Sequence, residues 1–65
     1  MIYAAYDRQT GERLCYDMTE AGVHKALKDC YKRDEYFIKE HESFEAMAGL
    51  PVLTDAERQA LCDEL

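Results

Sequence analysis

The sequence predicts an α+β fold, a small antiparallel sheet packed against one main amphipathic helix, with short helices toward the C-terminus. Three observations support this prediction. Two β-favouring segments flank a polar turn in residues 1–18, apolar residues follow helical spacing in residues 20–33, and helix-capping residues occur at positions 43 and 54. The 65 residues are expected to form a single domain over residues 1–65, and so short a chain buries only a thin core.

Residues 1–18 have the pattern of a β-hairpin. The segments Met1–Tyr6 and Arg13–Met18 contain β-forming side chains, and the polar residues between them include Gly11, which can adopt a positive φ in a turn. Counting with a period of two places five side chains on the core side of this sheet and leaves Tyr3 and Asp17 nearer to solvent. The five are Ile2, Ala4, Tyr6, Leu14 and Tyr16.

The clearest periodic signal predicts an amphipathic helix over residues 20–33. Thr19 is a suitable N-cap, and Met18 is spaced to form a hydrophobic staple with Val23. Apolar residues recur at the i, i+3, i+4 and i+7 positions that form one buried face of a helix. These residues are Val23, Ala26, Leu27, Cys30 and Tyr31.

Residues 34–42 allow two interpretations. One is a third strand that pairs with the hairpin, and the other is a continuation of the preceding helix. The short run Tyr36–Ile38 is rich in β-favouring side chains. We therefore prefer the third strand.

Two short helices are predicted near the C-terminus. Ser43 can cap a helix over Phe44–Ala48, which Gly49 ends. The residues from Thr54 onward have the form of a capping box, which predicts a helix over residues 55–64. Its apolar stripe is short, so this helix should pack at the edge of the domain. The stripe consists of Leu61, Cys62 and Leu65.

The cysteines and histidines do not indicate a metal site or a catalytic site. Cys15, Cys30 and Cys62 are odd in number and contain no closely spaced pair, which favours reduced thiols over disulfides or structural zinc ligands. His24 and His41 are interpreted as structural or solvated side chains, because no nucleophile with a partnered base is evident. No cofactor is expected, and the protein is expected not to be an enzyme.

The net charge of −6 belongs to the second half of the chain. Residues 1–33 have six basic and five acidic side chains, whereas residues 34–65 have two basic and nine acidic ones. A solvated surface is the simplest explanation of such charge. Another explanation is an acidic face that mimics backbone phosphates, with aromatic rings as apolar anchors. The acidic stretch consists of Asp34, Glu35, Glu40, Glu42 and Glu45, with Tyr36, Phe37 and Phe44 among them.

Three lysines, Lys25, Lys28 and Lys32, fall on the polar face of the predicted main helix. Such a stripe is most often the solvated face of a helix, although lysines at this spacing can also contact phosphates. The acidic balance of the whole chain opposes a DNA-binding role.

The whole-chain profile resembles the small acidic proteins that phages and mobile elements encode against bacterial defences, above all anti-CRISPR proteins. The length, the acidic balance and the carboxylate-aromatic stretch from Asp34 to Glu45 carry this resemblance. It implies a non-enzymatic inhibitor that binds a nucleic-acid-handling effector complex and blocks its DNA-recognition surface.

We expect such an inhibitor to act in the cytoplasm of a bacterial host, because the N-terminus has no pattern of an export signal. A basic nucleic-acid-binding protein or complex is the expected partner, with neither nucleic acid nor a membrane bound directly. The expected partner-binding residues are Asp34, Glu35, Tyr36, Glu40, Glu42, Phe44 and Glu45.

Two alternatives stay open at this point. A small phage or bacterial adaptor, or an antitoxin-like regulator, would dock through aromatic and apolar contacts, so charge reversal and salt would matter little to it. A nucleic-acid binder would use the lysine stripe and would bind DNA directly at low salt. The oligomeric state is also open, because no heptad pattern predicts a coiled-coil dimer.

Overall fold

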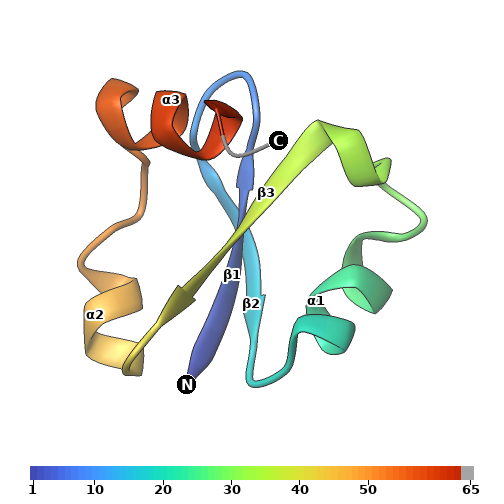
Figure 1. Ribbon diagram of the computed structural model, residues 1–65. Helices are drawn as coiled ribbons and strands as arrows, with labels where there is room; N and C mark the ends of the chain where they lie inside the picture. The colour runs from blue at the N-terminus through green and yellow to red at the C-terminus, as the bar shows by residue number, and fades with distance from the viewer. Residues whose placement is uncertain (64–65) are drawn as a thin grey trace.

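Three antiparallel strands form one sheet at the centre of the molecule (Figure 1). The computed structural model describes residues 1–63, with side chains up to residue 61. Strand β1 (Ile2–Asp7) lies between β2 (Arg13–Asp17) and β3 (Tyr36–His41). The segment that allowed two interpretations therefore contains a strand, and the predicted α+β fold is confirmed.

Hydrogen bonds around Gly11 fix the turn between β1 and β2. The Asp7 carboxylate accepts from the backbone N–H groups of Gln9 at 2.7 Å and Thr10 at 3.0 Å. Gly11 has a φ of +78°, and a Cβ atom there would lie 3.0 Å from the carbonyl oxygen of Leu53. The N–H of Leu53 donates to the carbonyl oxygen of Gly11 at 2.8 Å. The turn is thus tied to the C-terminal part of the chain.

Helices cover both faces of the sheet, whereas the sequence predicted one main covering helix. Helix α1 (Glu20–Leu27) packs on one face, and α2 (Phe44–Ala48) with residues 50–53 packs on the other (Figure 1). Because successive strand side chains point to opposite faces, the buried residues divide into two clusters. The α1-side cluster is Ala5, Val23, Leu27 and Tyr36, and the α2-side cluster is Ala4, Tyr6, Phe37, Met47 and Leu53.

Three sheet residues lie in positions that differ from the predicted ones. Tyr3, predicted to lie nearer to solvent, is half-buried and packs against the α1-side cluster. Leu14 also packs on the α1 side, because a register shift between Ala5 and Tyr6 leaves it without a partner in β1. Tyr16 is 48% exposed and is not a core residue. The core side chains predicted for β1 do lie together, on the α2 side.

Helix α1 is shorter than the predicted helix over residues 20–33. It ends at Leu27, and the N–H groups of Cys30 and Tyr31 both donate to the Leu27 carbonyl oxygen, at 2.9 and 2.8 Å. Residues 29–31 are weak helix formers, and the turn allows Tyr31 to pack against the α1-side cluster. Of the predicted apolar face, Ala26 within the helix and Cys30 beyond its end are exposed.

The N-terminus of α1 has the predicted cap but lacks the predicted hydrophobic staple. The Thr19 hydroxyl accepts from the N–H of Gly22 at 3.0 Å. Met18 is 73% exposed, so it does not pack on the buried Val23. Instead, the Asp17 carboxylate accepts from the N–H groups of Met18 and Thr19. A Cβ atom added to Gly22 would come within 2.5 Å of this carboxylate. Glycine at this position therefore makes room for the acidic side chain.

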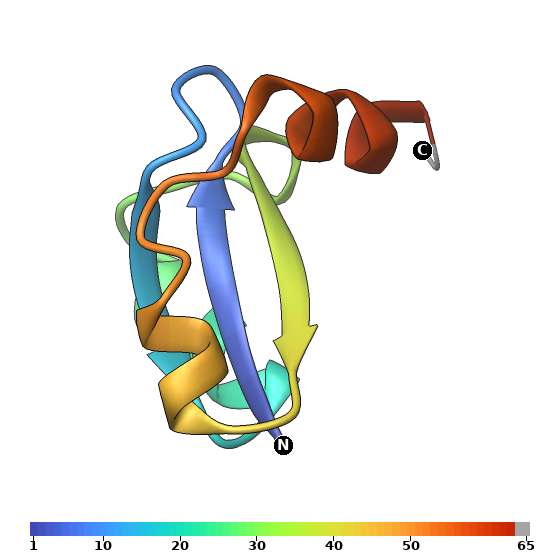
Figure 2. The same ribbon diagram turned by 90° about the vertical axis from the view of Figure 1, so that its left-hand side faces the viewer.

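Helix α2 forms as predicted from its capping residues. The Ser43 hydroxyl accepts from the N–H of Ala46 at 3.2 Å, and the N–H of Gly49 donates to the Glu45 carbonyl oxygen at 3.0 Å. Met47 is the buried residue of this helix. Figure 2 shows α2 beside the lower part of the strands and α3 (Asp55–Asp63) beyond their upper end.

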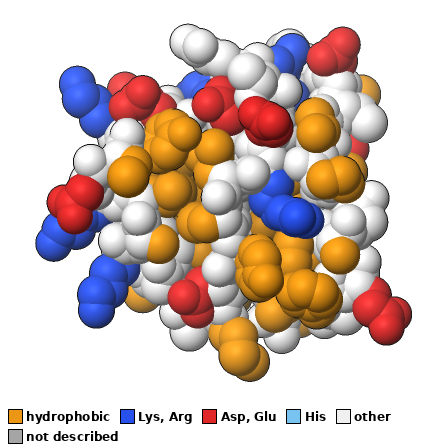
Figure 3. All heavy atoms as spheres, turned by 180° about the vertical axis from the view of Figure 1, so that it is seen from behind, with side chains coloured by type: hydrophobic (Ala, Val, Ile, Leu, Met, Phe, Trp, Pro, Cys, Tyr) orange, Lys and Arg blue, Asp and Glu red, His pale blue; other side chains and the backbone are white. Residues whose placement is uncertain are grey.

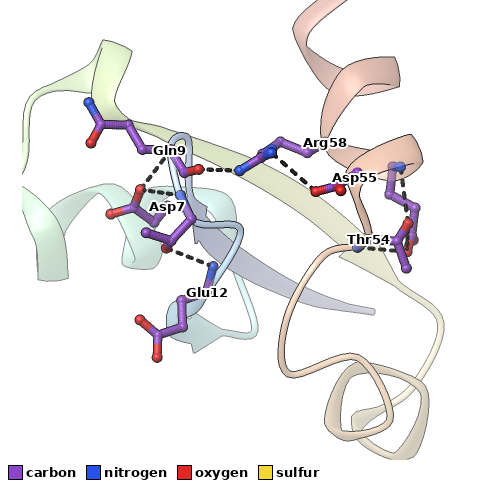
Figure 4. Close-up of polar contacts among 8 residues, drawn as sticks. Asp7, Gln9, Glu12, Thr54, Asp55 and Arg58 are labelled. Atoms are coloured by element: carbon purple, nitrogen blue, oxygen red, sulfur yellow. Dashed lines mark hydrogen bonds and ion pairs between the residues drawn. The ribbon is translucent and has the colours of Figure 1, made fainter.

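Helix α3 begins with the predicted capping box and is anchored to the hairpin turn. The Thr54 hydroxyl accepts from the N–H of Glu57 at 3.2 Å, and the Glu57 carboxylate accepts from the N–H of Thr54 at 3.4 Å. Arg58 donates to the carbonyl oxygen of Gln9 in the turn and pairs with Asp55 at 3.2 Å (Figure 4). These polar contacts place α3 over one end of the sheet.

Apolar packing of α3 involves Leu61, which lies against the α2-side cluster. This agrees with the predicted position at the edge of the domain. The other two residues of the predicted stripe, Cys62 and Leu65, lie outside the described side chains. Within residues 1–63, we find no helix with the length and apolarity needed to cross a membrane.

Candidate functional site: an aromatic pair beside exposed carboxylates

The structure divides the predicted acidic stretch between the two ends of β3. Asp34 and Glu35 belong to a 3-10 helix, Arg33–Glu35, that leads into the strand, whereas Glu42 and Glu45 follow its last residue. Six residues of extended strand span about 20 Å. The carboxylates therefore form two separated groups and not one continuous face.

The group before β3 has local structural roles. The Glu35 carboxylate accepts from the backbone N–H of Lys32 at 2.9 Å, and the Glu35 carbonyl oxygen accepts from the N–H of Arg8 at 3.1 Å. Asp34, Glu35 and Arg8 line the same small hollow together with Asp7 and Gln9. The Arg8 guanidinium also lies 4.6 Å from the ring centre of Phe37. A basic side chain therefore offsets the acidic charge at this end of the strand.

Tyr36 was predicted as a partner-binding residue, but its side chain is only 5% exposed. It belongs to the α1-side cluster, and its hydroxyl lies 2.7 Å from Nδ1 of His24. The ring is part of the core and has no surface with which to anchor a partner. The sequence prediction was wrong here because it assumed that only one face of the sheet is covered.

The group after β3 lies beside an exposed aromatic pair. Phe44 is 53% exposed and Tyr16 is 48% exposed, and their rings meet edge to face with centres 5.4 Å apart. Glu42 and Glu45 are exposed neighbours of Phe44 in the chain. We call these four residues the aromatic surface. Figure 3 shows hydrophobic side chains gathered on the lower part of one face, with acidic side chains around its margin.

Arg13 holds the two elements of the aromatic surface together. Its guanidinium donates to the carbonyl oxygen and to the sulfur of Met47, both at 3.1 Å, and so links β2 to α2. The same guanidinium lies 5.9 Å from the ring centre of Tyr16. Tyr16 from β2 and Phe44 from α2 are thus held in contact although the chain separates them widely.

Glu40 is exposed but lies apart from the aromatic surface. Side chains alternate along β3, and Tyr36 and Ile38 pack on the α1 side. Glu40 therefore shares the α1 side, whereas Tyr16 pairs across the sheet with Ala4 and lies on the α2 side. Of the seven predicted residues, the structure brings together Glu42, Phe44 and Glu45.

The carboxylates of the aromatic surface have no basic partner within the described part of the chain. The ion pairs found there are His24–Glu20, Lys39–Glu57 and Arg58–Asp55. Glu42 and Glu45 belong to none of them and face solvent. Their charges are therefore free to attract a basic group on another molecule.

Tyr16 is the residue of this surface that sequence reasoning missed. Its alternation with Leu14 suggested a core position, but β2 is an edge strand and α2 has only five residues. A helix so short buries its own Met47 against the sheet but leaves Tyr16 half uncovered. A strong preference of tyrosine for half-buried positions was the available signal.

The described side chains do not gather metal-ligating residues. No group of three or more His, Cys, Asp or Glu side chains that could hold a metal ion occurs among them. Burial, with a smaller effect of Asp17, raises the pKa of the Cys15 thiol. Cys15 is therefore a protonated thiol near neutral pH, which is the less nucleophilic form.

Comparison of the chain with protein-family models, with curated proteins and with solved structures found no match in any of the three. The function is therefore inferred from the chemistry of the surface.

Proposed function

We propose that the protein is a non-enzymatic inhibitor that uses the aromatic surface to bind a basic, nucleic-acid-handling effector complex. Bound there, it blocks the surface with which the complex recognises DNA, as expected of an anti-CRISPR-like protein. The observation that carries the proposal is the exposed Tyr16–Phe44 ring pair beside the unpaired carboxylates of Glu42 and Glu45.

Each part of this surface suits a groove that normally holds nucleic acid. Arginine and lysine side chains that contact phosphates also form charge-assisted hydrogen bonds with carboxylates. Aromatic rings dominate the binding energy of many protein interfaces because they bury a large area at little entropic cost. Glu42 and Glu45 would take the place of phosphates, and Phe44 would supply the apolar anchor.

The alternative is a small adaptor or antitoxin-like regulator that docks through apolar contacts. Further exposed apolar side chains, Met18 and Val52, favour it, because they show that uncharged apolar surface is not limited to the ring pair. The two functions share Phe44 and differ in whether the carboxylates contribute. Charge reversal at Glu42 and Glu45 therefore distinguishes them.

The test is capture of binding proteins from a bacterial lysate at low salt. The wild-type protein is compared with Glu42→Lys/Glu45→Lys and with Phe44→Ser. Asp29→Lys/Asp34→Lys is the matched control, since it changes the net charge equally at exposed residues outside the aromatic surface. We expect the wild type and the control to retain a nucleic-acid-binding protein that both surface variants lose.

Two results would count against the inhibitor. Equal loss in the matched control would mean that only net charge matters. Retention of the partner by Glu42→Lys/Glu45→Lys, together with its loss by Phe44→Ser, would favour the apolar adaptor.

A further inference from the structure

The α1 side of the molecule carries a groove with a basic rim. Its volume is about 530 Å³, and its rim is formed by Lys25, Lys28, Lys32 and Arg33. The lysines that the sequence placed on a solvated helix face therefore surround a concave site. Figure 3 shows basic side chains projecting along the side of the molecule on which α1 lies.

These four cations are not neutralised by acidic side chains of the described chain. All four are exposed, and none takes part in the ion pairs found among the side chains of residues 1–61. Such clustering is unexpected in a protein with a net charge of −6. Like charges around one groove repel one another, and a bound anion would relieve that repulsion.

The floor of the groove is aromatic and held in place. Tyr31 is half-buried against the α1-side cluster, and Tyr36 is buried with its hydroxyl 2.7 Å from Nδ1 of His24. Nε2 of the same histidine lies 3.6 Å from the Glu20 carboxylate, so both ring nitrogens have a neighbour that orients them. Tyr36 thus forms a fixed base to the groove, and the half-buried Tyr31 is the ring on which a planar group can stack.

We propose that this groove binds a single nucleotide, with its phosphates on the basic rim and its base against Tyr31. The rim supplies the charge that phosphates require, and Tyr31 supplies the stacking surface. A long nucleic acid fits less well, because residues 34–65, with two basic and nine acidic side chains, would repel a polyanion that extends beyond the groove. The α1 side is opposite the aromatic surface, so this site is independent of the proposed inhibitor function.

The test uses ADP as the probe, titrated at low salt into the full-length protein and followed by two-dimensional amide NMR. We expect shifts confined to residues 24–36. The variant Lys28→Gln/Lys32→Gln should weaken ADP binding about fivefold or more. Lys39→Gln is the control, since Lys39 pairs with Glu57 away from the groove, and it should leave the affinity unchanged.

Replacement of Tyr31 tests the stacking contact separately. Tyr31→Leu should weaken ADP binding about fivefold or more but leave the binding of inorganic phosphate unchanged. Tyr31→Phe keeps the ring and the packing and should bind ADP as the wild type does.

Several results would overturn the proposal. The absence of shifts with ADP would do so, as would equal affinity in Lys28→Gln/Lys32→Gln. If inorganic phosphate binds as tightly as ADP, the groove is a phosphate site and not a nucleotide site. If a ten-residue oligothymidylate binds more tightly than ADP, the ligand is single-stranded nucleic acid.

Discussion

The hydroxyl of Tyr6 requires a proton on one particular ring nitrogen of its neighbour His41 in the core. It lies 3.0 Å from the carbonyl oxygen of Leu50, which can only accept, so the hydroxyl donates its proton there. The contact with Nε2 of His41, at 2.9 Å, must then use a proton on that nitrogen. Burial lowers the pKa of His41, and the positive charges of Lys39 and Arg13 lower it further. The folded protein therefore favours neutral His41 with its proton on Nε2.

His41 should make the protein less stable in mild acid. Below about pH 6.5, the usual histidine pKa, the unfolded chain takes up a proton that folded His41 resists. The free energy of unfolding should therefore fall as the pH drops through about 6.5 toward the lowered folded-state pKa. Above that range His41 contributes no pH dependence. Urea unfolding between about pH 5 and 8 measures this, and His41→Gln should remove that component of the slope. An unchanged slope would contradict the assignment.

Gly11 is required by the backbone, whereas Gly49 is not. Gly11→Ala forces an alanine into φ +78° and brings its Cβ to 3.0 Å from the Leu53 carbonyl oxygen. We expect a loss of about 1–3 kcal/mol in the free energy of unfolding. Gly49→Ala is the control, since φ is −74° and its nearest contact would be 3.5 Å, so its effect should stay within about 0.5 kcal/mol. Urea unfolding measures both variants. If Gly11→Ala loses no more unfolding free energy than Gly49→Ala, the turn does not need glycine.

At the scale of the elements, α2 has one buried side chain that stabilises the fold, Met47, and one exposed side chain proposed to bind a partner, Phe44. Met47 is fully buried, so Met47→Ala should lower the free energy of unfolding by about 2–5 kcal/mol. Phe44→Ser loses the edge-to-face contact with Tyr16, which is worth about 1 kcal/mol. Thermal and urea unfolding of the two variants measure the difference. If Phe44→Ser destabilises as much as Met47→Ala, Phe44 is a core residue and not a binding residue.

The secondary structure could be predicted wherever a local signal decides it. The hydroxyls of Thr19, Ser43 and Thr54 each accept from the backbone N–H three residues later in the chain. Because these contacts are local, the sequence was enough to predict where α1, α2 and α3 begin. The end of α1 depends in part on a tertiary contact, because Tyr31 packs against the α1-side cluster instead of continuing the helix. Local periodicity does not contain that information.

At the scale of the whole molecule, the candidate site could be predicted only in part, because tertiary packing decides which side chains are exposed. Glu42, Phe44 and Glu45 are close in sequence and stay together, but Tyr36 faces the core because both faces of the sheet are covered. Tyr16 reaches the aromatic surface from β2 through the contacts of Arg13 with α2. Which side chains meet across a sheet depends on packing that one sequence does not reveal.

The charge distribution makes the proposed inhibitor sensitive to salt. Exposed charges are screened over about 10 Å at 0.1 M salt and about 3 Å at 1 M. Binding of the partner, measured by titration from about 0.05 to 0.5 M salt, should weaken steadily for the wild type. The dependence should be much smaller for Glu42→Gln/Glu45→Gln, which removes the two charges and keeps Phe44. An affinity that does not change with salt would favour the apolar adaptor.

Competition between the protein and DNA for the captured partner tests the central claim most directly. The fluorescence anisotropy of a labelled DNA duplex bound to the partner is followed while the protein is added. The account predicts that the wild type and Asp29→Lys/Asp34→Lys displace the DNA at near-stoichiometric amounts, while Glu42→Lys/Glu45→Lys and Phe44→Ser do not. Formation of a complex in which the partner still holds its DNA would contradict it.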